Sequence, residues 1–183
     1  MTTDKEIIHI SKFLSLVLRH QPELIGLSLN SEGWANVNDL LKLSEKHERK
    51  ITRDMLNTVV ATNSKKRFAF SDDHQMIRAS QGHSIEVALG YKPQQPPEIL
   101  FHGTGSQSVS SILKTGLQKQ SRQHVHLSAD IITAANVGQR HGKPVVLEIL
   151  AGKMHQEGYL FFLSANDVWL TEHVPSAFIR SLN

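Results

Sequence analysis

The stretch Ser121-Arg122-Gln123-His124-Val125-His126-Leu127-Ser128 alternates polar and apolar side chains. Because successive side chains of a strand point to opposite faces, a strand here would bury Val125 and Leu127. The same geometry would place Arg122, His126 and Ser128 together on the other face. That face would offer a cation, an imidazole and a hydroxyl to one cleft, although a solvated edge strand is the simpler interpretation of the stretch taken alone.

The sequence around this stretch alternates short strands with short helices. Residues 99–101 are expected to form a strand that leads into His102-Gly103-Thr104, and a helix should follow at about 107–114. Ser128 can cap a further helix that runs to about Gln139. The remaining strands are expected at 145–150, 159–163, 168–170 and 177–179.

The first ninety residues show a different order of elements. Thr3 and Glu6 match a capping box before a helix, and this helix should end near His20 because Pro22 disfavours helix at the preceding residue. A short strand is expected at 27–29, a turn at 30–33, helices from about Asn38 and after Thr52, and a hairpin at 67–78. This order is typical of a winged-helix module, a fold that often binds nucleic acid but does not have to.

A proline-rich segment, Lys92-Pro93-Gln94-Gln95-Pro96-Pro97, separates the two patterns. Prolines favour extended chain and stop regular structure. We therefore expect an α+β protein with a winged-helix lobe over residues 1–92, a linker over 93–98 and a second lobe with mostly antiparallel sheets over 99–183.

Composition excludes several classes of function. The 183 residues include no cysteine, which excludes disulfides and thiolate chemistry. The longest apolar runs, such as 159–163, are too short to span a bilayer, and the N-terminus lacks the pattern of a secretion signal. A net charge of +3 permits a nucleic-acid partner without demanding one. We expect a cytoplasmic protein without a membrane partner.

Three arginines come from separate predicted elements. Arg19 lies at a helix end, Arg67 begins the hairpin and Arg122 belongs to the second lobe. Guanidinium groups bind phosphate oxygens through paired donors, so convergence of these residues across a cleft would suit a phosphate monoester. His20 could donate a proton to that phosphate or accept one. Each arginine taken alone is better explained as a solvated surface residue.

Other polar motifs are weak when taken singly. Gly103 within His102-Gly103-Thr104 would let a ligand approach the backbone or would supply an unusual turn conformation. Gln81-Gly82-His83-Ser84 is expected to form the turn that ends the hairpin. His124 and His126 could bind a metal ion, but no third ligand follows at a recognisable spacing, so we expect no metal.

The ordered set of motifs is far more specific than its parts. The motifs are Ser15-Leu16-Val17-Leu18-Arg19-His20-Gln21-Pro22, Gly33-Trp34, Arg67-Phe68, Arg78 with Gln81-Gly82-His83-Ser84, His102-Gly103-Thr104, Arg122 with His124-Val125-His126-Leu127-Ser128, and Val168-Trp169-Leu170. Together they closely resemble the RNA 2′-phosphotransferase family, NAD-dependent enzymes that remove the splice-junction 2′-phosphate in tRNA processing. The resemblance extends from about Lys12 to about Leu170.

The resemblance implies a winged-helix lobe followed by a lobe of the NAD-dependent ADP-ribosyltransferase fold. It also implies that the RNA 2′-phosphate attacks the nicotinamide-ribose anomeric carbon of NAD and expels nicotinamide. The new ribose 2-hydroxyl then attacks the phosphate, which releases RNA with a free 2′-hydroxyl and ADP-ribose 1″,2″-cyclic phosphate. NAD would be a co-substrate, and the partner of this monomer would be a tRNA-like RNA bearing a 2′-phosphate.

Residue roles follow from the matched positions. Arg19, His20, Arg67 and Arg122 match the set that grips the phosphate and drives the chemistry. The residues expected to bind NAD are His102, Gly103, Thr104, His126, Ser128 and Val168. Val168 takes the position where protein-modifying relatives have Glu, and a carboxylate there would repel a phosphate.

Two further functions remain open from the sequence. An ADP-ribosyltransferase that caps the phosphate ends of nucleic acids would use the same NAD pocket and stop after one transfer. A non-catalytic winged-helix nucleic-acid binder would leave the motifs from His102 to Ser128 without a role. A toxin that consumes NAD is disfavoured by the missing Glu and by the absence of a secretion pattern.

Overall fold

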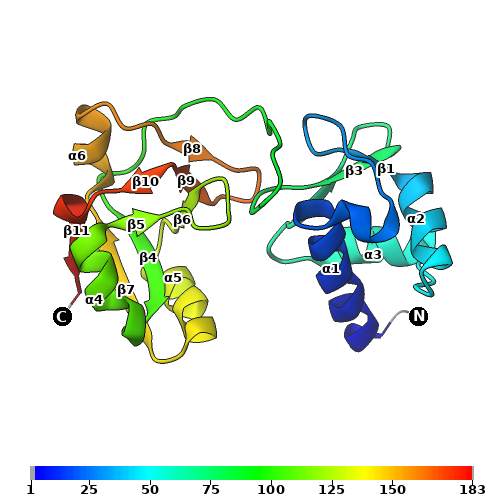
Figure 1. Cartoon of the computed structure of the whole chain (residues 1–183), viewed down its shortest axis with the longest axis horizontal. Helices are drawn as coiled ribbons and strands as arrows, with labels where there is room; N and C mark the ends of the chain where they lie inside the picture. The colour runs from blue at the N-terminus through cyan, green and yellow to red at the C-terminus, as the bar shows by residue number, and fades with distance from the viewer. Residues whose placement is uncertain (1–2, 183) are drawn as a thin grey trace. The chain divides into compact units, whose positions relative to one another are not determined.

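The computed structural model describes residues 3–182, and the chain divides into two compact units, Met1–Gly90 and Tyr91–Asn183 (Figure 1). Both units contain helices and sheets, and every named strand pair within the described residues is antiparallel. The expected α+β class is therefore confirmed. Within residues 3–182, no helix combines the length and apolar character needed to cross a membrane.

The first unit packs three helices and a short 3-10 helix with a three-stranded sheet. Its elements are α1 (Asp4–Arg19), a 3-10 helix (Pro22–Ile25), β1 (Ala35–Asn36), α2 (Val37–Lys46), α3 (Arg53–Thr62), β2 (Phe68–Phe70) and β3 (Met76–Ala79), and the sheet has the order β1-β3-β2 (Figure 1). The core of this unit consists of residues between Ile10 and Ala79.

Side-chain caps fix where the helices of the first unit begin. Thr3 and Glu6 form the expected capping box before α1. Asn36 caps α2 through the N–H groups of Asn38 and Asp39, and the hydroxyl of Thr52 caps α3. These caps satisfy donors that the helices cannot pair internally, so the helix starts could be predicted from local sequence.

The expected strand at 27–29 is wrong. The 3-10 helix ends at Gly26, which adopts a left-handed conformation, and residues 27–29 run without a partner strand. Leu27 is buried and Leu29 half-buried, so the alternation reflects packing against the core and not pairing in a sheet. The strand of this region that does pair is β1 (Ala35–Asn36), which joins β3 on the side opposite β2.

The second unit contains two three-stranded sheets and one strand pair. Its elements are β4 (Leu100–Gly105), α4 (Ser106–Thr115), β5 (Leu117–Gln118), β6 (Val125–Leu127), α5 (Ile131–Gly138), a 3-10 helix (Gln139–His141), β7 (Pro144–Ile149), α6 (Ala151–Gln156), β8 (Phe162–Leu163), β9 (Trp169–Thr171), β10 (His173–Val174), a 3-10 helix (Ser176–Phe178) and β11 (Ile179–Ser181) (Figure 1). The sheet orders are β11-β7-β4, β6-β9-β8 and β10-β5. Its core lies between Leu100 and Ile179.

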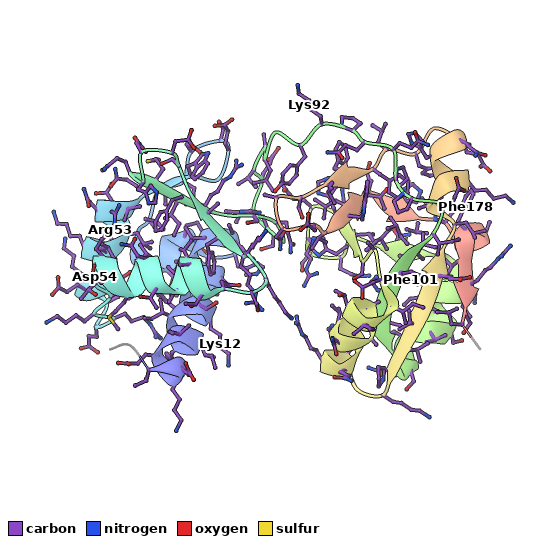
Figure 2. The ribbon with its side chains drawn as sticks, turned by 180° about the vertical axis from the view of Figure 1, so that it is seen from behind. Lys12, Arg53, Asp54, Lys92, Phe101 and Phe178 are labelled. Carbon is purple, nitrogen blue, oxygen red and sulfur yellow. The ribbon has the colours of Figure 1, made fainter. Side chains whose placement is uncertain are left out.

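A backbone bridge joins the two larger sheets of this unit. Phe101 on β4, labelled in Figure 2, exchanges two hydrogen bonds with Ser128 (2.9 and 2.8 Å). Since Ser128 directly follows β6, the bridge brings the first part of β4 beside the end of β6. His102 and His126 are thereby brought close together in space although 24 residues separate them.

Several expectations for the second unit need correction. Asp130, not Ser128, caps α5, because its Oδ1 accepts the Thr133 N–H at 2.7 Å while the Ser128 backbone is engaged with β4. His102-Gly103-Thr104 lies inside β4 and does not follow it. The strand expected at 177–179 begins as a 3-10 helix, residues 159–161 are not in a strand, and α6 was not expected.

Candidate active site

In the first unit, α1 and β2 bring Arg19 and Arg67 together. Arg19 is the last residue of α1, and its Nη2 donates to the backbone carbonyl of Arg67 at 3.4 Å. The Arg19 guanidinium carbon lies 5.9 Å from the ring centroid of Phe68, and Arg67 Nη1 donates to Asn63 Oδ1 at 3.3 Å. Arg19 and Arg67, two of the three predicted phosphate-binding residues of this unit, therefore belong to one cluster.

His20 lies at the edge of this cluster and is held by Ser84. The backbone N–H of His20 donates to the Leu16 carbonyl, which fixes its backbone at the end of α1. Its Nδ1 lies 2.9 Å from Ser84 Oγ, and the Ser84 backbone N–H donates to the Arg19 carbonyl at 3.0 Å. Ser84 thus contacts both predicted residues at the end of this helix.

His83 is a buried, neutral imidazole beside the same cations. Its side chain is 1% exposed, and neither ring nitrogen has a hydrogen-bond partner within residues 3–182. Burial, and to a smaller degree the charges of Arg19, His20 and Arg78, lower its pKa from 6.5 to about 4. Arg78 itself lies over the Trp34 ring, with its guanidinium carbon 4.4 Å from the centroid.

In the second unit, Arg122 and His126 form a direct contact. Arg122 Nη1 lies 2.6 Å from His126 Nδ1. A guanidinium can only donate, so Nδ1 must accept and the ring proton of His126 must be on Nε2. Partial burial and the charge of Arg140 lower the pKa of Arg122, but a guanidinium keeps its charge at neutral pH. Arg122 and His126 are in contact, but Arg122 lies in a bend before β6, so the expected strand, which was to carry both residues on one face, covers only Val125–Leu127.

His102 is oriented by the backbone of β6. Its Nδ1 donates to the His126 carbonyl at 3.1 Å, which leaves Nε2 as an acceptor when the ring is neutral. Burial lowers the pKa of His102, and this hydrogen bond opposes the change only in part. The bridge between Phe101 and Ser128 holds the two backbones in the register that this contact needs. His102 is therefore a fixed neutral acceptor next to the Arg122–His126 pair.

The remaining predicted NAD-binding residues belong to the same strands as His102 and His126 or to the segments beside them. Gly103 is in β4, and a Cβ built on it would meet the backbone oxygen of Ala134 in α5 at 1.6 Å. Thr104 is 7% exposed. Val168 is half-buried directly before β9, and its N–H donates to Ser164 Oγ at 3.0 Å. The reason for glycine at 103 is thus close packing of helix on strand, a reason that was not among those expected.

The His124-Val125-His126 motif does not assemble a metal site among the described residues. No group of three or more His, Cys, Asp or Glu side chains is placed to hold a metal ion within residues 3–182. The ring of His124 packs against Phe162 with centroids 5.7 Å apart, and His126 accepts from Arg122. Both imidazoles therefore have partners other than a metal ion.

Sequence reasoning located most of these residues but missed two contacts. It gave no orienting role to Ser84, because nothing local in Gln81-Gly82-His83-Ser84 indicates a contact with a helix end 64 residues away. It also missed Asn63, which holds the Arg67 side chain. Convergence of Arg122 with Arg19, His20 and Arg67 stays a prediction.

Comparison with known proteins agrees with the resemblance seen in the motifs. The sequence model of the family described as "RNA 2′-phosphotransferase, Tpt1 / KptA family" matches residues 5–173. A protein of Pectobacterium carotovorum named "Probable RNA 2′-phosphotransferase" is 53% identical over 173 residues, 94% of this chain and 93% of that one.

Further relatives with the same name come from other organisms. The Flavobacterium johnsoniae protein is 52% identical over 171 residues, 93% of this chain and 94% of its own. The Acaryochloris marina protein is 51% identical over 175 residues, 96% of this chain and 97% of its own. With a family match over most of its length and full-length relatives at about half identity, the chain belongs to the RNA 2′-phosphotransferase, Tpt1 / KptA family.

Proposed function

We propose that this protein is an NAD-dependent RNA 2′-phosphotransferase. It would transfer an internal RNA 2′-phosphate to NAD through a 2′-phospho-ADP-ribosylated RNA intermediate, and leave 2′-hydroxyl RNA, nicotinamide and ADP-ribose 1″,2″-cyclic phosphate. The observation that carries the proposal is the family match over residues 5–173, together with the close contacts among the matched residues within each unit.

The first unit is proposed to be a winged-helix lobe. The order of α1, β1, α2, α3 and the β2–β3 hairpin supports this, because it is the order of helices and strands in such modules. The second unit is proposed to be an ADP-ribosyltransferase-like lobe. Two small antiparallel sheets that meet at one bridge, with helices beside them, are compatible with that assignment.

Arg19, His20, Arg67 and Arg122 are proposed to bind the RNA phosphate. Paired guanidinium donors match the oxygens of a phosphate monoester, and they also stabilise the negative charge that develops on phosphorus during transfer. Arg19 and Arg67 already lie in one cluster, and His20 beside them can take up or release a proton. Arg122 would supply the cation on the side of NAD.

The residues around β4 and β6 fit a bound dinucleotide. NAD would supply an electrophilic anomeric carbon and nicotinamide as the leaving group. The acceptor Nε2 of neutral His102 suits a ribose hydroxyl, and the Arg122 guanidinium suits an anionic group. Gly103, Thr104, His126 and Ser128 build the β4–β6 corner around them, and the uncharged Val168 adds no repulsion toward a phosphate.

The decisive experiment uses purified protein, NAD and a short RNA with one internal 2′-phosphate. Chromatography should detect 2′-hydroxyl RNA and a cyclic phosphate of ADP-ribose, and neither should form without NAD or from the same RNA lacking the 2′-phosphate. A product that stops at ADP-ribosylated RNA would favour an end-capping transferase. Binding of RNA without any NAD-dependent product would favour a non-catalytic nucleic-acid binder.

The cellular setting is part of the same proposal. A cytoplasmic monomer that acts on tRNA-like RNA and needs no metal is consistent with a cysteine-free chain. Activity that survives a strong chelator and a sedimentation mass near 20.5 kDa would support the metal-free monomer.

A further inference from the structure

Ser84 meets the end of α1 through two separate contacts. Its backbone N–H donates to the carbonyl of Arg19 at 3.0 Å, and its Oγ lies 2.9 Å from Nδ1 of His20. The first contact satisfies one of the carbonyls that a helix leaves unpaired at its C-terminus. The second involves only the hydroxyl, so a substitution that removes the hydroxyl can separate the two roles.

The segment that carries Ser84 is itself held in place. The preceding residue, His83, is buried beside the Gly33 turn, where a Cβ on Gly33 would lie 3.5 Å from His83 Nε2. Four residues after Ser84, the Ala88 N–H donates to the Ser31 carbonyl at 2.8 Å. Ser84 is therefore presented to α1 by anchors on both sides, although its own side chain is exposed.

A hydroxyl at Nδ1 differs chemically from the carbonyl or carboxylate that often orients a histidine. A carbonyl only accepts, and so it fixes one tautomer. A hydroxyl can donate to a bare Nδ1 or accept from Nδ1–H by rotating about its C–O bond. When Nε2 gains a proton and later loses it, Nδ1 keeps its own hydrogen, so Ser84 Oγ accepts from Nδ1–H throughout and the contact persists.

We propose that Ser84 is the positioning residue for His20, whose ring it holds through Nδ1 so that Nε2 faces the reacting phosphate. This inference rests on the proposed function and extends it to a residue that acts through His20. A proton that enters at Nε2 leaves from Nε2, and the serine keeps its own proton throughout. The backbone of His20 is already fixed by α1, so rotation of the ring is the freedom that Ser84 removes.

The test compares Ser84→Ala, Ser84→Thr and the control Ser28→Ala with the parent protein on a 2′-phosphorylated RNA and NAD. Ser84→Ala keeps the backbone bond to Arg19 but should lower kcat by roughly tenfold to a hundredfold, the range seen when a metal-bound histidine loses the group that orients its other nitrogen. KM for the RNA should stay within about twofold. Ser84→Thr should restore most of kcat because the exposed site has room for a methyl group, and exposed Ser28 should have no effect.

A second measurement does not depend on turnover. In ¹⁵N-histidine-labelled protein, the signals of His20 can be identified by their loss in His20→Asn. Ser84→Ala should shift the His20 ring nitrogens, and Ser28→Ala should leave them in place. Unchanged ring signals, an unchanged kcat in Ser84→Ala, or a Ser84→Thr variant as slow as Ser84→Ala would each overturn the inference. A parent protein that makes no product would overturn the proposed function instead, while the nitrogen signals would still decide whether Ser84 holds the ring.

Discussion

At Arg122 and His126, the direction of one hydrogen bond determines the state of both side chains. Because the guanidinium can only donate, His126 must be the neutral tautomer with its proton on Nε2. The His126 backbone carbonyl in turn orients His102. One residue of β6 therefore positions a cation through its ring and a neutral acceptor through its main chain, the two groups proposed to bind the phosphate and the dinucleotide.

Loss of the Arg122 cation tests this arrangement directly. If Arg122 stabilises the charge that builds on phosphorus, Arg122→Ala should slow turnover by roughly 10²–10³, as for other preorganised donors. ADP-ribosylated RNA should accumulate, since the second step carries most of that charge. Arg180→Ala, an exposed cation on β11, serves as the control. Parental turnover in Arg122→Ala, measured on a 2′-phosphorylated oligonucleotide, would show that the assignment is wrong.

His83 makes the stability of the protein depend on pH. Its pKa is about 4 in the fold and 6.5 as a free group, so the unfolded chain binds the extra proton first. The contribution of neutral His83 to the free energy of unfolding is fully present above pH 6.5. It is lost as the pH falls from 6.5 toward 4, which lowers the free energy of unfolding by about 3 kcal/mol. Urea unfolding followed by Trp34 fluorescence in a Trp169→Phe background should show this loss. In His83→Asn the loss should be smaller, and in the exposed control His47→Asn it should match the parent.

The residues that could be predicted from sequence are those whose neighbours in the chain reveal their role. Val125 and Leu127 were expected to be buried from their alternation, and they are. The contact of Ser84 with His20 and the burial of His83 could not be predicted in this way, because both depend on a helix end far away in the sequence. Pairings of that kind are set by tertiary packing, which local periodicity does not report.

At the scale of elements, the packing of α5 on β4 explains a glycine that the motif alone left ambiguous. Gly103 was expected to admit a ligand or to form a turn, but it lies inside β4 under the backbone of Ala134. The capped starts of α1 and α3 and the β2–β3 hairpin were predictable from local chemistry, whereas the cap of α5 was expected at Ser128 and is Asp130. The expected strand at 27–29 was wrong, because alternation of polar and apolar residues does not show whether a partner strand exists. The short helix α6 was missed as well.

Gly103→Ala should therefore destabilise the second unit. A Cβ at this position would lie 1.6 Å from a backbone oxygen, so α5 would have to move away from β4 at a cost of at least about 1–3 kcal/mol. Gly26→Ala is a useful comparison, since Gly26 has open space around it and only a left-handed backbone, worth about 1 kcal/mol. Urea unfolding followed by Trp169 fluorescence in a Trp34→Phe background measures the cost of Gly103→Ala. Trp34 fluorescence in a Trp169→Phe background measures the cost of Gly26→Ala. An unchanged midpoint in Gly103→Ala would contradict the close packing of α5 on β4.

For the molecule as a whole, the two cores do not share residues. The core of the first unit lies between Ile10 and Ala79, and that of the second between Leu100 and Ile179. Each core is built from helices and sheets of its own unit, so each unit contains the apolar surface that its own folding buries. The proposed chemistry, in contrast, needs both units. Arg19, His20 and Arg67 belong to the first unit, and His102, Arg122 and His126 belong to the second.

This division predicts that folding can be separated from activity. Residues 1–90 and 91–183, prepared as separate chains, should each show near-ultraviolet circular dichroism and a cooperative unfolding transition, since each retains its complete core. Neither chain alone should release nicotinamide or a cyclic phosphate, because phosphate-binding residues and NAD-binding residues are then on different molecules. The intact protein at equal concentration is the control. Turnover by residues 91–183 alone would remove Arg19, His20 and Arg67 from the mechanism, and a half without cooperative unfolding would show that the cores are not independent.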